Sequence, residues 1–159
     1  VILCSGASTS GVELKNVLRK AYDIELEMAS VNYCIAMTGL GDKEDSFSKL
    51  IDALFSLDDS LANRNGLVRQ NSLKIAQKAL EPYQIKGLSV EMVDFDKSVG
   101  RICAENVWAY PPGAPIIVKG ERIDFEFVKH ATLEYENGVN VTSEMGTFPN
   151  GIIVVKEEK

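Results

Sequence analysis

A cluster of prolines constrains the fold of this chain more than any other feature of its sequence. The prolines are Pro111, Pro112 and Pro115. Each one fixes its φ near about −65° and removes a backbone hydrogen-bond donor, while Gly113 supplies the freedom to turn. Apolar residues recur on both sides, at 101–107 and 116–119. The sequence therefore predicts two strands joined by a stiff loop.

A carboxylate and two aromatic side chains lead into this loop: Glu105, Trp108 and Tyr110. Rigid loops on a folded scaffold often position ligands or partner subunits. An elbow that only connects two strands would show the same prolines, so this alternative stays open. If the loop is functional, the candidate residues for a substrate-site wall or a partner contact are Glu105, Trp108, Tyr110, Pro111, Pro112 and Gly113.

The first part of the chain predicts the element order β-α-β-β-α. Strands are expected at residues 1–5, 24–28 and 33–40. Ser10 and Glu13 have the spacing of a capping box at the start of a helix. Asp42 is expected to cap the second helix, whose predicted buried face is Phe47, Leu50, Ile51 and Leu54. This order is typical of helices on one side of a small, largely antiparallel sheet.

The second part of the chain mixes helices and strands as well. Residues 72–80 predict a helix stopped by Pro82, and residues 94–99 predict one helical turn. Asp124 is expected to cap the last helix, with a hydrophobic staple between Ile123 and Val128. The face predicted for that helix is Phe125, Val128, Thr132 and Tyr135. Gly138 would end the helix, and strands are expected at 139–145 and 152–155.

These patterns predict an α+β fold, with a small β-α-β-β-α sandwich lobe followed by a second mixed α+β lobe. The predicted boundaries are a first lobe at 1–62, a connecting segment with a helix at 63–81, and a second lobe at 82–159. The sequence opens on Val1 within an apolar run and without methionine. We therefore expect it to be cut from a longer polypeptide.

The composition excludes several classes of protein. Twenty-three acidic residues against seventeen Lys and Arg give a net charge of −6, which disfavours nucleic acid as a partner. No apolar run approaches the roughly 20 residues of a membrane span. The cysteines form no CxxC pair and there is one histidine, so no metal site is expected. Buried, reduced thiols at Cys4, Cys34 and Cys103 indicate a cytoplasmic protein.

Three further patterns were considered as sites. The glycines at 39 and 41 precede a helix and could cradle a phosphate, although a plain turn is the simpler interpretation. His130 is interpreted as a surface or half-buried helix residue. Glu25 and Glu27 alternate with apolar residues; they fit either the wet face of a strand or a paired-carboxylate site, and the sequence leaves both open.

Residues 100–121 resemble the pattern GRxxAExxxxYPPGxPxxxxGE in the C-terminal domain of the ornithine/lysine/arginine decarboxylase family, bacterial fold-type-I enzymes that depend on pyridoxal phosphate. Ile123 continues the match, while Ala114 and Lys119 depart from it. The segment at 10–29 also resembles the part of the family that follows the cofactor domain. Residues 100–107 resemble molybdenum-cofactor insertion proteins too, but those lack the YPPG continuation.

The resemblance implies a C-terminal fragment without catalytic residues. In the family, a lysine of the large domain, typically after Ser-x-His, binds the cofactor covalently, and no Ser-x-His-Lys occurs here. Pyridoxal phosphate would belong to the parent protein, and this fragment would bind none. Residues 1–62 would be the small lobe of a fold-type-I enzyme, and 82–159 the decarboxylase C-terminal domain carrying the PPG loop.

The parent would be a lyase that decarboxylates a small basic amino acid, in polyamine biosynthesis, and a homo-oligomer (a dimer or higher). This portion would shape the active-site entrance and the dimer contacts. Glu105 is the first candidate to pair with the ammonium or guanidinium group of the substrate, and Tyr110 with the PPG turn would form the wall. Ornithine, lysine and arginine remain open as substrates.

Two readings outside this family also remain open. The chain could be a stand-alone α+β module that binds or senses a small molecule, or a purely structural oligomerisation domain. The first predicts a ligand-dependent shift in melting temperature, and the second predicts self-association without any response to ligand.

Overall fold

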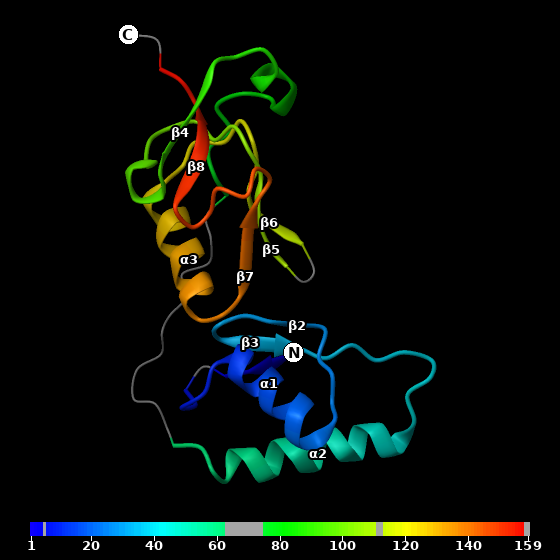
Figure 1. Cartoon of the computed structure of the whole chain (residues 1–159). Helices are drawn as coiled ribbons and strands as arrows, with labels where there is room; N and C mark the ends of the chain where they lie inside the picture. The colour runs from blue at the N-terminus through cyan, green and yellow to red at the C-terminus, as the bar shows by residue number, and fades with distance from the viewer. Residues whose placement is uncertain (5, 63–74, 111–112, 158–159) are drawn as a thin grey trace. The chain divides into compact units, whose positions relative to one another are not determined.

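A computed structural model describes residues 1–4, 6–62, 75–110 and 113–157, which fall into two units. The first unit is Val1–Gln70 and the second is Asn71–Lys159 (Figure 1). Each unit mixes helices with small sheets, which confirms the α+β class and the two mixed lobes. The lobe boundaries predicted after residues 62 and 81 stay predictions.

The first unit has the predicted order β-α-β-β-α. Its elements are β1 (Ile2–Leu3), α1 (Gly11–Tyr22), β2 (Met28–Ala29), β3 (Tyr33–Ile35) and α2 (Glu44–Asp58). The strands form one sheet in the order β1-β3-β2, and both pairings are antiparallel. Its core gathers buried residues of the sheet and both helices around Leu18, Leu26 and Cys34.

The start of α1 follows the predicted capping box. The Ser10 hydroxyl accepts a hydrogen bond of 3.1 Å from the Glu13 amide, and the Glu13 carboxylate accepts one of 2.8 Å from the Ser10 amide. Gly11 lies against β3 so closely that a Cβ would stand 2.1 Å from the Tyr33 carbonyl oxygen. Only glycine therefore fits at the first position of this helix.

All three predicted strands of the first unit are shorter than expected, and the one predicted at 33–40 comprises only Tyr33–Ile35. The strand predicted at 24–28 is reduced to Met28–Ala29, because the Ile24 amide donates to the Leu18 carbonyl of α1 and pairing with β3 begins with the 2.9 Å hydrogen bond from the Glu27 amide to the Ile35 carbonyl. Glu25 there lies 3.0 Å from Arg19 and 3.6 Å from Lys15 of that helix. The strand predicted at 1–5 comprises only Ile2 and Leu3, and Leu3 is 73% exposed, not buried.

Helix α2 differs from its prediction at both its cap and its face. Lys43 is the N-cap residue, because the Asp42 carboxylate instead accepts a 2.7 Å hydrogen bond from the Gly39 amide. The side that packs on the core carries Leu50, Ala53, Leu54 and Leu57. Phe47 and Ile51 are 45% and 51% exposed, because they lie at the solvent edge of this side of the helix.

The second unit holds two antiparallel sheets beside one helix. Its elements are the 3-10 turns η1 (Pro82–Ile85) and η2 (Phe95–Lys97), the strands β4 (Val90–Asp94), β5 (Val107–Tyr110), β6 (Ala114–Ile117), β7 (Asn140–Ser143) and β8 (Gly151–Val155), and α3 (Phe125–Glu136). One sheet pairs β4 with β8, and the other has the order β6-β5-β7. The short turn η2 matches the helical turn predicted at 94–99.

The helix predicted at 72–80 is wrong in its described part, residues 75–80, which has no helical structure. The amides of Ala79 and Leu80 both donate 2.9 Å hydrogen bonds to the Gly120 carbonyl. A Cβ on Gly120 would stand 2.2 Å from the Leu80 carbonyl oxygen, so this approach needs glycine. A contact across about 40 residues thus overrides the local helical pattern.

Helix α3 begins as predicted, because the Asp124 carboxylate accepts a 2.7 Å hydrogen bond from the Phe127 amide. Ile123 and Val128, the predicted staple, are both buried. The buried face is shifted from the prediction, however, and consists of Phe127, Val128, Ala131 and Glu134. Phe125 and Tyr135 are 64% and 45% exposed. Phe127 turns inward because its ring packs edge-on against that of Phe95, with centroids 5.7 Å apart.

Candidate functional site

The strands on either side of the proline segment, β5 and β6, form a β-hairpin. Strand β5 pairs antiparallel with β6 through Trp108–Pro115 and Ala109–Ala114. The strand predicted at 101–107 is wrong up to residue 106, where isolated bridges at Ile102 and Cys103 replace it, and the strand predicted at 116–119 begins two residues earlier. Gly113 has φ +91° and donates a 3.0 Å hydrogen bond to the Ala109 carbonyl. Pro111 and Pro112 lie outside the described residues. Figure 1 shows the hairpin standing out from the second unit.

The other strand of this sheet holds the hairpin in place. β5 lies in the centre, and all four of its residues pair with β7. β6 is an edge strand, which tolerates Pro115 because its missing amide faces away from the sheet. The hairpin therefore has a paired base and an exposed tip.

The two predicted aromatic residues stand on the same side of β5, because side chains two apart share a face of a strand. Trp108 is half-buried, and Tyr110 is 56% exposed at the end of the strand. Val107 points the other way and is completely buried. The structure thus brings Trp108, Tyr110 and Gly113 together at the hairpin, with Tyr110 presented to its surroundings.

Glu105 does not lie on the hairpin surface. Its side chain is 1% exposed. One carboxylate oxygen accepts hydrogen bonds of 2.7 Å from the Thr147 hydroxyl and from the Ile153 amide, and the other accepts one of 2.9 Å from the Met145 amide. A buried carboxylate requires such donors. Because its own unit supplies them, Glu105 joins the segment after β7 to strand β8, and this geometry favours a structural role over contact with a ligand.

A second buried polar residue continues this arrangement. Ser143, at the end of β7, is 4% exposed. Its hydroxyl accepts hydrogen bonds from the amides of Thr147 and Phe148 at 3.0 and 3.2 Å, and lies 3.1 Å from the Thr147 hydroxyl. Glu105, Ser143 and Thr147 therefore form one network that orders residues 144–150. Ser143 and Thr147 could not be identified from the sequence, because their partners are remote or depend on the loop conformation.

An ion pair lies beside the base of the hairpin. The Lys119 ammonium is 2.9 Å from the Glu144 carboxylate, which also accepts hydrogen bonds from the Asn106 side chain and amide at 3.1 and 3.2 Å. The hydrogen bond from Lys119 holds the pKa of Glu144 below its usual value. Lys119, a departure from the family pattern, thus helps to fix the chain that leads into the hairpin.

The remaining sequence candidates do not form sites in the described residues. The Gly39 amide is used by Asp42 in an exposed turn. Glu25 pairs with cations of α1 and Glu27 is exposed, which supports the solvated-face interpretation. His130 is half-buried on α3, and burial lowers its pKa.

All three cysteines are buried and free, as predicted. Within the described ranges, no group of three or more His, Cys, Asp and Glu side chains is placed to hold a metal ion. In the same part of the chain, no helix combines the length and apolar character that a membrane span requires.

The comparison with protein families decides the relationship of the second unit. Residues 69–137 match the family described as Orn/Lys/Arg decarboxylase, C-terminal domain. This match contains Glu105, the whole hairpin and α3. Residues 69–137 thus form a C-terminal domain of the Orn/Lys/Arg decarboxylase family.

Several relatives are named as arginine decarboxylases. The protein from Bacillus subtilis is 25% identical over all of this chain, which covers 33% of that relative. The one from Bacillus cereus is 34% identical over 65% of this chain and 23% of the relative. The chain therefore spans a third or less of these curated relatives, and corresponds to a C-terminal portion of a decarboxylase-family protein.

Solved structures of this family share the fold. The constitutive lysine decarboxylase of E. coli matches with a TM-score of 0.59 at 15% identity, over 92% of this chain and 28% of that one. The lysine decarboxylase of Francisella novicida matches with a TM-score of 0.64 at 14% identity, over 95% and 30%. Both matches extend beyond the second unit, so the first unit belongs to the same fold.

Proposed function

We propose that this chain is the C-terminal portion of a pyridoxal-phosphate-dependent decarboxylase of basic amino acids, and that its β5–β6 hairpin borders the active-site entrance or a dimer contact. The family match over residues 69–137 carries this proposal. The hairpin supports it, because a paired base and an exposed aromatic tip suit a contact with another domain or subunit. The parent would be a cytoplasmic lyase.

Within this proposal, Tyr110 and Trp108 form the contact face and Gly113 shapes the turn beside them. Tyr110 has the larger role, since it is the more exposed of the two aromatic residues. Aromatic side chains of this kind exclude water and confine a substrate or a partner at low entropic cost. Neither residue needs to move a proton for this function.

Glu105 acts as a positioning residue in this scheme. It begins the segment that leads into β5, and its carboxylate is saturated by donors of the segment after β7 and of β8. β7 is also the strand that pairs with β5. Glu105 thus ties the segment that leads into the hairpin to the segment after β7 and to β8, and its loss would loosen the hairpin without removing a substrate contact.

Two described features, the glycine turn before α2 and Lys129, do not fit the cofactor. In the described residues, the Gly39 amide in the glycine turn before α2 already donates a hydrogen bond to the Asp42 carboxylate, and Lys129 is an exposed residue of α3. Neither arrangement offers a phosphate cradle next to a buried lysine. The chemistry therefore belongs to the remainder of the parent protein, and this chain supplies shape and contacts.

A chimera tests this function. The corresponding portion of the Bacillus subtilis arginine decarboxylase would be replaced by this chain, and carbon dioxide release would be measured with arginine, lysine and ornithine. We expect a folded, cofactor-loaded chimera that decarboxylates at least one of the three. A truncated relative that lacks this portion provides the baseline. Full activity of the truncated relative, or a folded chimera with no activity above that baseline, would contradict the proposal.

A further inference from the structure

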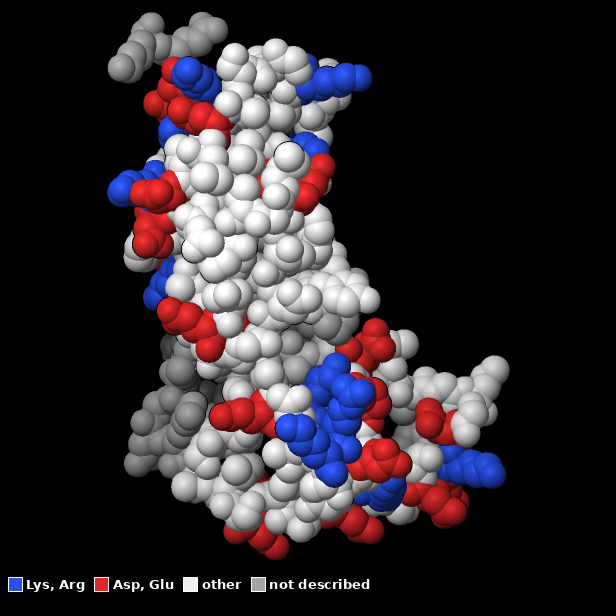
Figure 2. Space-filling view, viewed as in Figure 1, with Lys and Arg blue, Asp and Glu red and all other residues white. Residues whose placement is uncertain are grey.

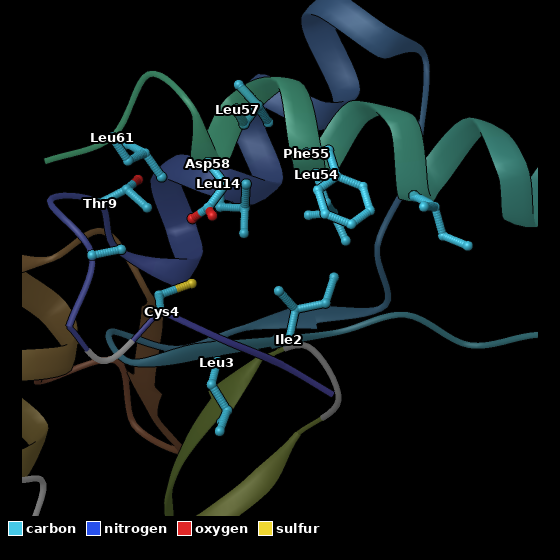
Figure 3. Close-up of a pocket in the computed structure, with 12 residues that line it drawn as sticks. Ile2, Leu3, Cys4, Thr9, Leu14, Leu54, Phe55, Leu57, Asp58 and Leu61 are labelled. Atoms are coloured by element: carbon cyan, nitrogen blue, oxygen red, sulfur yellow. The ribbon is translucent and has the colours of Figure 1, made fainter. Parts of the chain in front are cut away.

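The first unit contains a cavity of about 330 Å³ between the β1 strand and helix α2 (Figure 3). Its walls are mainly apolar and include Ile2, Leu14, Leu54, Phe55 and Leu61. Its volume lies near the lower end of the range for small-molecule pockets, about 300–1,000 Å³. The cavity therefore suits a small aliphatic compound better than a large ligand.

Two polar side chains gather at one end of this cavity. Asp58 and Thr9 both line it, and Figure 3 shows the Asp58 carboxylate and the Thr9 side chain close together beside Leu14 and Leu61. No Lys or Arg of the described ranges forms an ion pair with Asp58. The cavity thus has an apolar body and a single polar, negatively charged end.

The position of Asp58 in α2 strengthens this negative end. Asp58 is the last residue of the helix, Asp59 is its C-cap, and the last turn holds no basic residue. The carbonyl end of a helix already carries a partial negative charge, where cations are favourable and carboxylates are not. Acidic side chains line the edge of the unit along which α2 runs (Figure 2). A local arrangement that opposes helix stability is a signal of function.

We propose that this cavity binds a primary alkylammonium compound. The alkyl chain lies along Ile2, Leu54 and Phe55, and the ammonium group pairs with the Asp58 carboxylate at the end of α2. The Thr9 hydroxyl provides an additional acceptor for an ammonium proton. A carboxylate of the same length would be repelled, and a neutral alcohol would leave Asp58 without its counter-ion.

This site is independent of the proposed decarboxylase function. All of its residues belong to the first unit, whereas the hairpin belongs to the second. Its test uses binding to the full chain and needs no enzyme activity, so the failure of one proposal leaves the other standing.

The experiment is a titration of the full 159-residue chain with hexylamine, hexanol and hexanoate at neutral pH, followed by calorimetry and by the methyl NMR signals of Ile and Leu. We expect saturable one-to-one binding of hexylamine, about threefold to tenfold weaker binding of hexanol, and weaker binding still of hexanoate. Raised salt should weaken hexylamine binding and leave hexanol binding unchanged. Equal affinity for the three compounds, or no saturable binding of hexylamine, would overturn the proposal.

Two neighbouring aspartates provide a matched pair of variants. Asp58→Asn should lower the affinity for hexylamine about threefold to tenfold while leaving that for hexanol unchanged. Asp59→Asn removes the same charge one residue further on, outside the cavity lining, and should keep most of the affinity. Equal effects of the two variants would show general electrostatic attraction and overturn the site.

A filled cavity gives a second, independent check. Ala7 lines the cavity and is half-buried, so Ala7→Leu should occupy part of the space and abolish hexylamine binding. The melting temperature of this variant would show that it is folded. Unchanged binding in a folded Ala7→Leu chain would place the ligand elsewhere and overturn the proposal.

Discussion

The carboxylate of Glu105 accepts a 2.7 Å hydrogen bond from the hydroxyl of Thr147, although the two residues are 42 positions apart in the sequence. Both belong to a network that holds the strands around the hairpin base. This pair explains how a carboxylate that has no ion-pair partner among the described residues can be completely buried: amide and hydroxyl donors replace the water that burial removes.

The Glu105–Thr147 bond predicts a specific pattern of stability. Glu105→Gln should lower the free energy of unfolding by about 2–3 kcal/mol. The NH2 group of the glutamine would replace one carboxylate oxygen and would then face a hydrogen-bond donor without an acceptor. Thr147→Val should cost about 1–2 kcal/mol. Urea denaturation of both variants and of the double variant measures the coupling, and the double variant should lose less than the sum of the two. The control is Glu136→Gln at an exposed position of α3, which should change the free energy of unfolding by less than about 0.5 kcal/mol. An equally small change for Glu105→Gln would argue against the network.

The contact between Gly11 and β3 predicts that this glycine cannot be replaced. Gly11→Ala should destabilise the first unit by about 2–4 kcal/mol, because the new Cβ would overlap the Tyr33 and Ser30 carbonyl oxygens. Gly39→Ala is the control, since a Cβ there meets nothing within 4 Å. Thermal unfolding followed by circular dichroism would separate the two, and equal melting temperatures would count against the described packing of α1.

The single histidine predicts a simple pH dependence. Burial lowers the pKa of His130 below its usual value of 6.5, so the folded state binds this proton less readily than the unfolded state. Its contribution to stability is therefore complete above about pH 6.5 and is lost as the pH falls through the lower pKa of the folded state. Because the chain has one histidine, NMR titration of its ring reports this pKa directly. His130→Gln should flatten the dependence of stability on pH between about pH 7 and about pH 5. A titration midpoint of the His130 ring at or above about pH 6.5 in the native chain would refute the prediction.

The acidic end of α2 predicts a stabilising substitution. Asp59→Lys should raise the stability of the first unit by about 0.3–1 kcal/mol, because a cation replaces an anion at the negative end of the helix. Asp52→Lys makes the same change of net charge in the middle of the helix and should have a smaller effect. Chemical denaturation at low and high salt measures both, and the difference between them should shrink as salt is added.

Short-range features of the fold could be predicted from the sequence, because their partners are a few residues apart. The Ser10–Glu13 capping box, the Asp124 cap and the end of α3 near Gly138 are of this kind. The alternation of apolar and polar residues predicts less well which side of an apolar helix is buried. Phe125 and Phe127 both fit a helical stripe, and only the edge-on contact with Phe95 determines which of them is buried.

Long-range features could not be predicted from the sequence. The segment at 75–80 forms hydrogen bonds with Gly120 instead of continuing a helix, and the partners of Glu105 lie 40 to 48 residues away. The sequence predicts Glu105 as a candidate from the rigid loop beside it and from the family pattern, but it does not predict that the side chain is buried and bonded within its own unit. The sequence predicts the hairpin as a stiff turn between two strands. It does not predict the register of β5 with β7, which determines which side chains the hairpin exposes.

The most direct test of the account is the Michaelis constant of the arginine decarboxylase chimera when Tyr110 is replaced by Ala. Tyr83→Ala is the matched control, because Tyr83 is also an exposed tyrosine of the second unit, 76% exposed, but lies in η1 away from the hairpin strands. We predict that Tyr110→Ala raises KM or weakens the dimer about tenfold, a loss typical of an interface aromatic, without changing the melting temperature. The KM, dimer affinity and melting temperature of the Tyr83→Ala chimera should stay near those of the unsubstituted chimera. Unchanged KM, kcat and dimer affinity in the Tyr110→Ala chimera would contradict the claim that this hairpin borders the active site or the dimer contact.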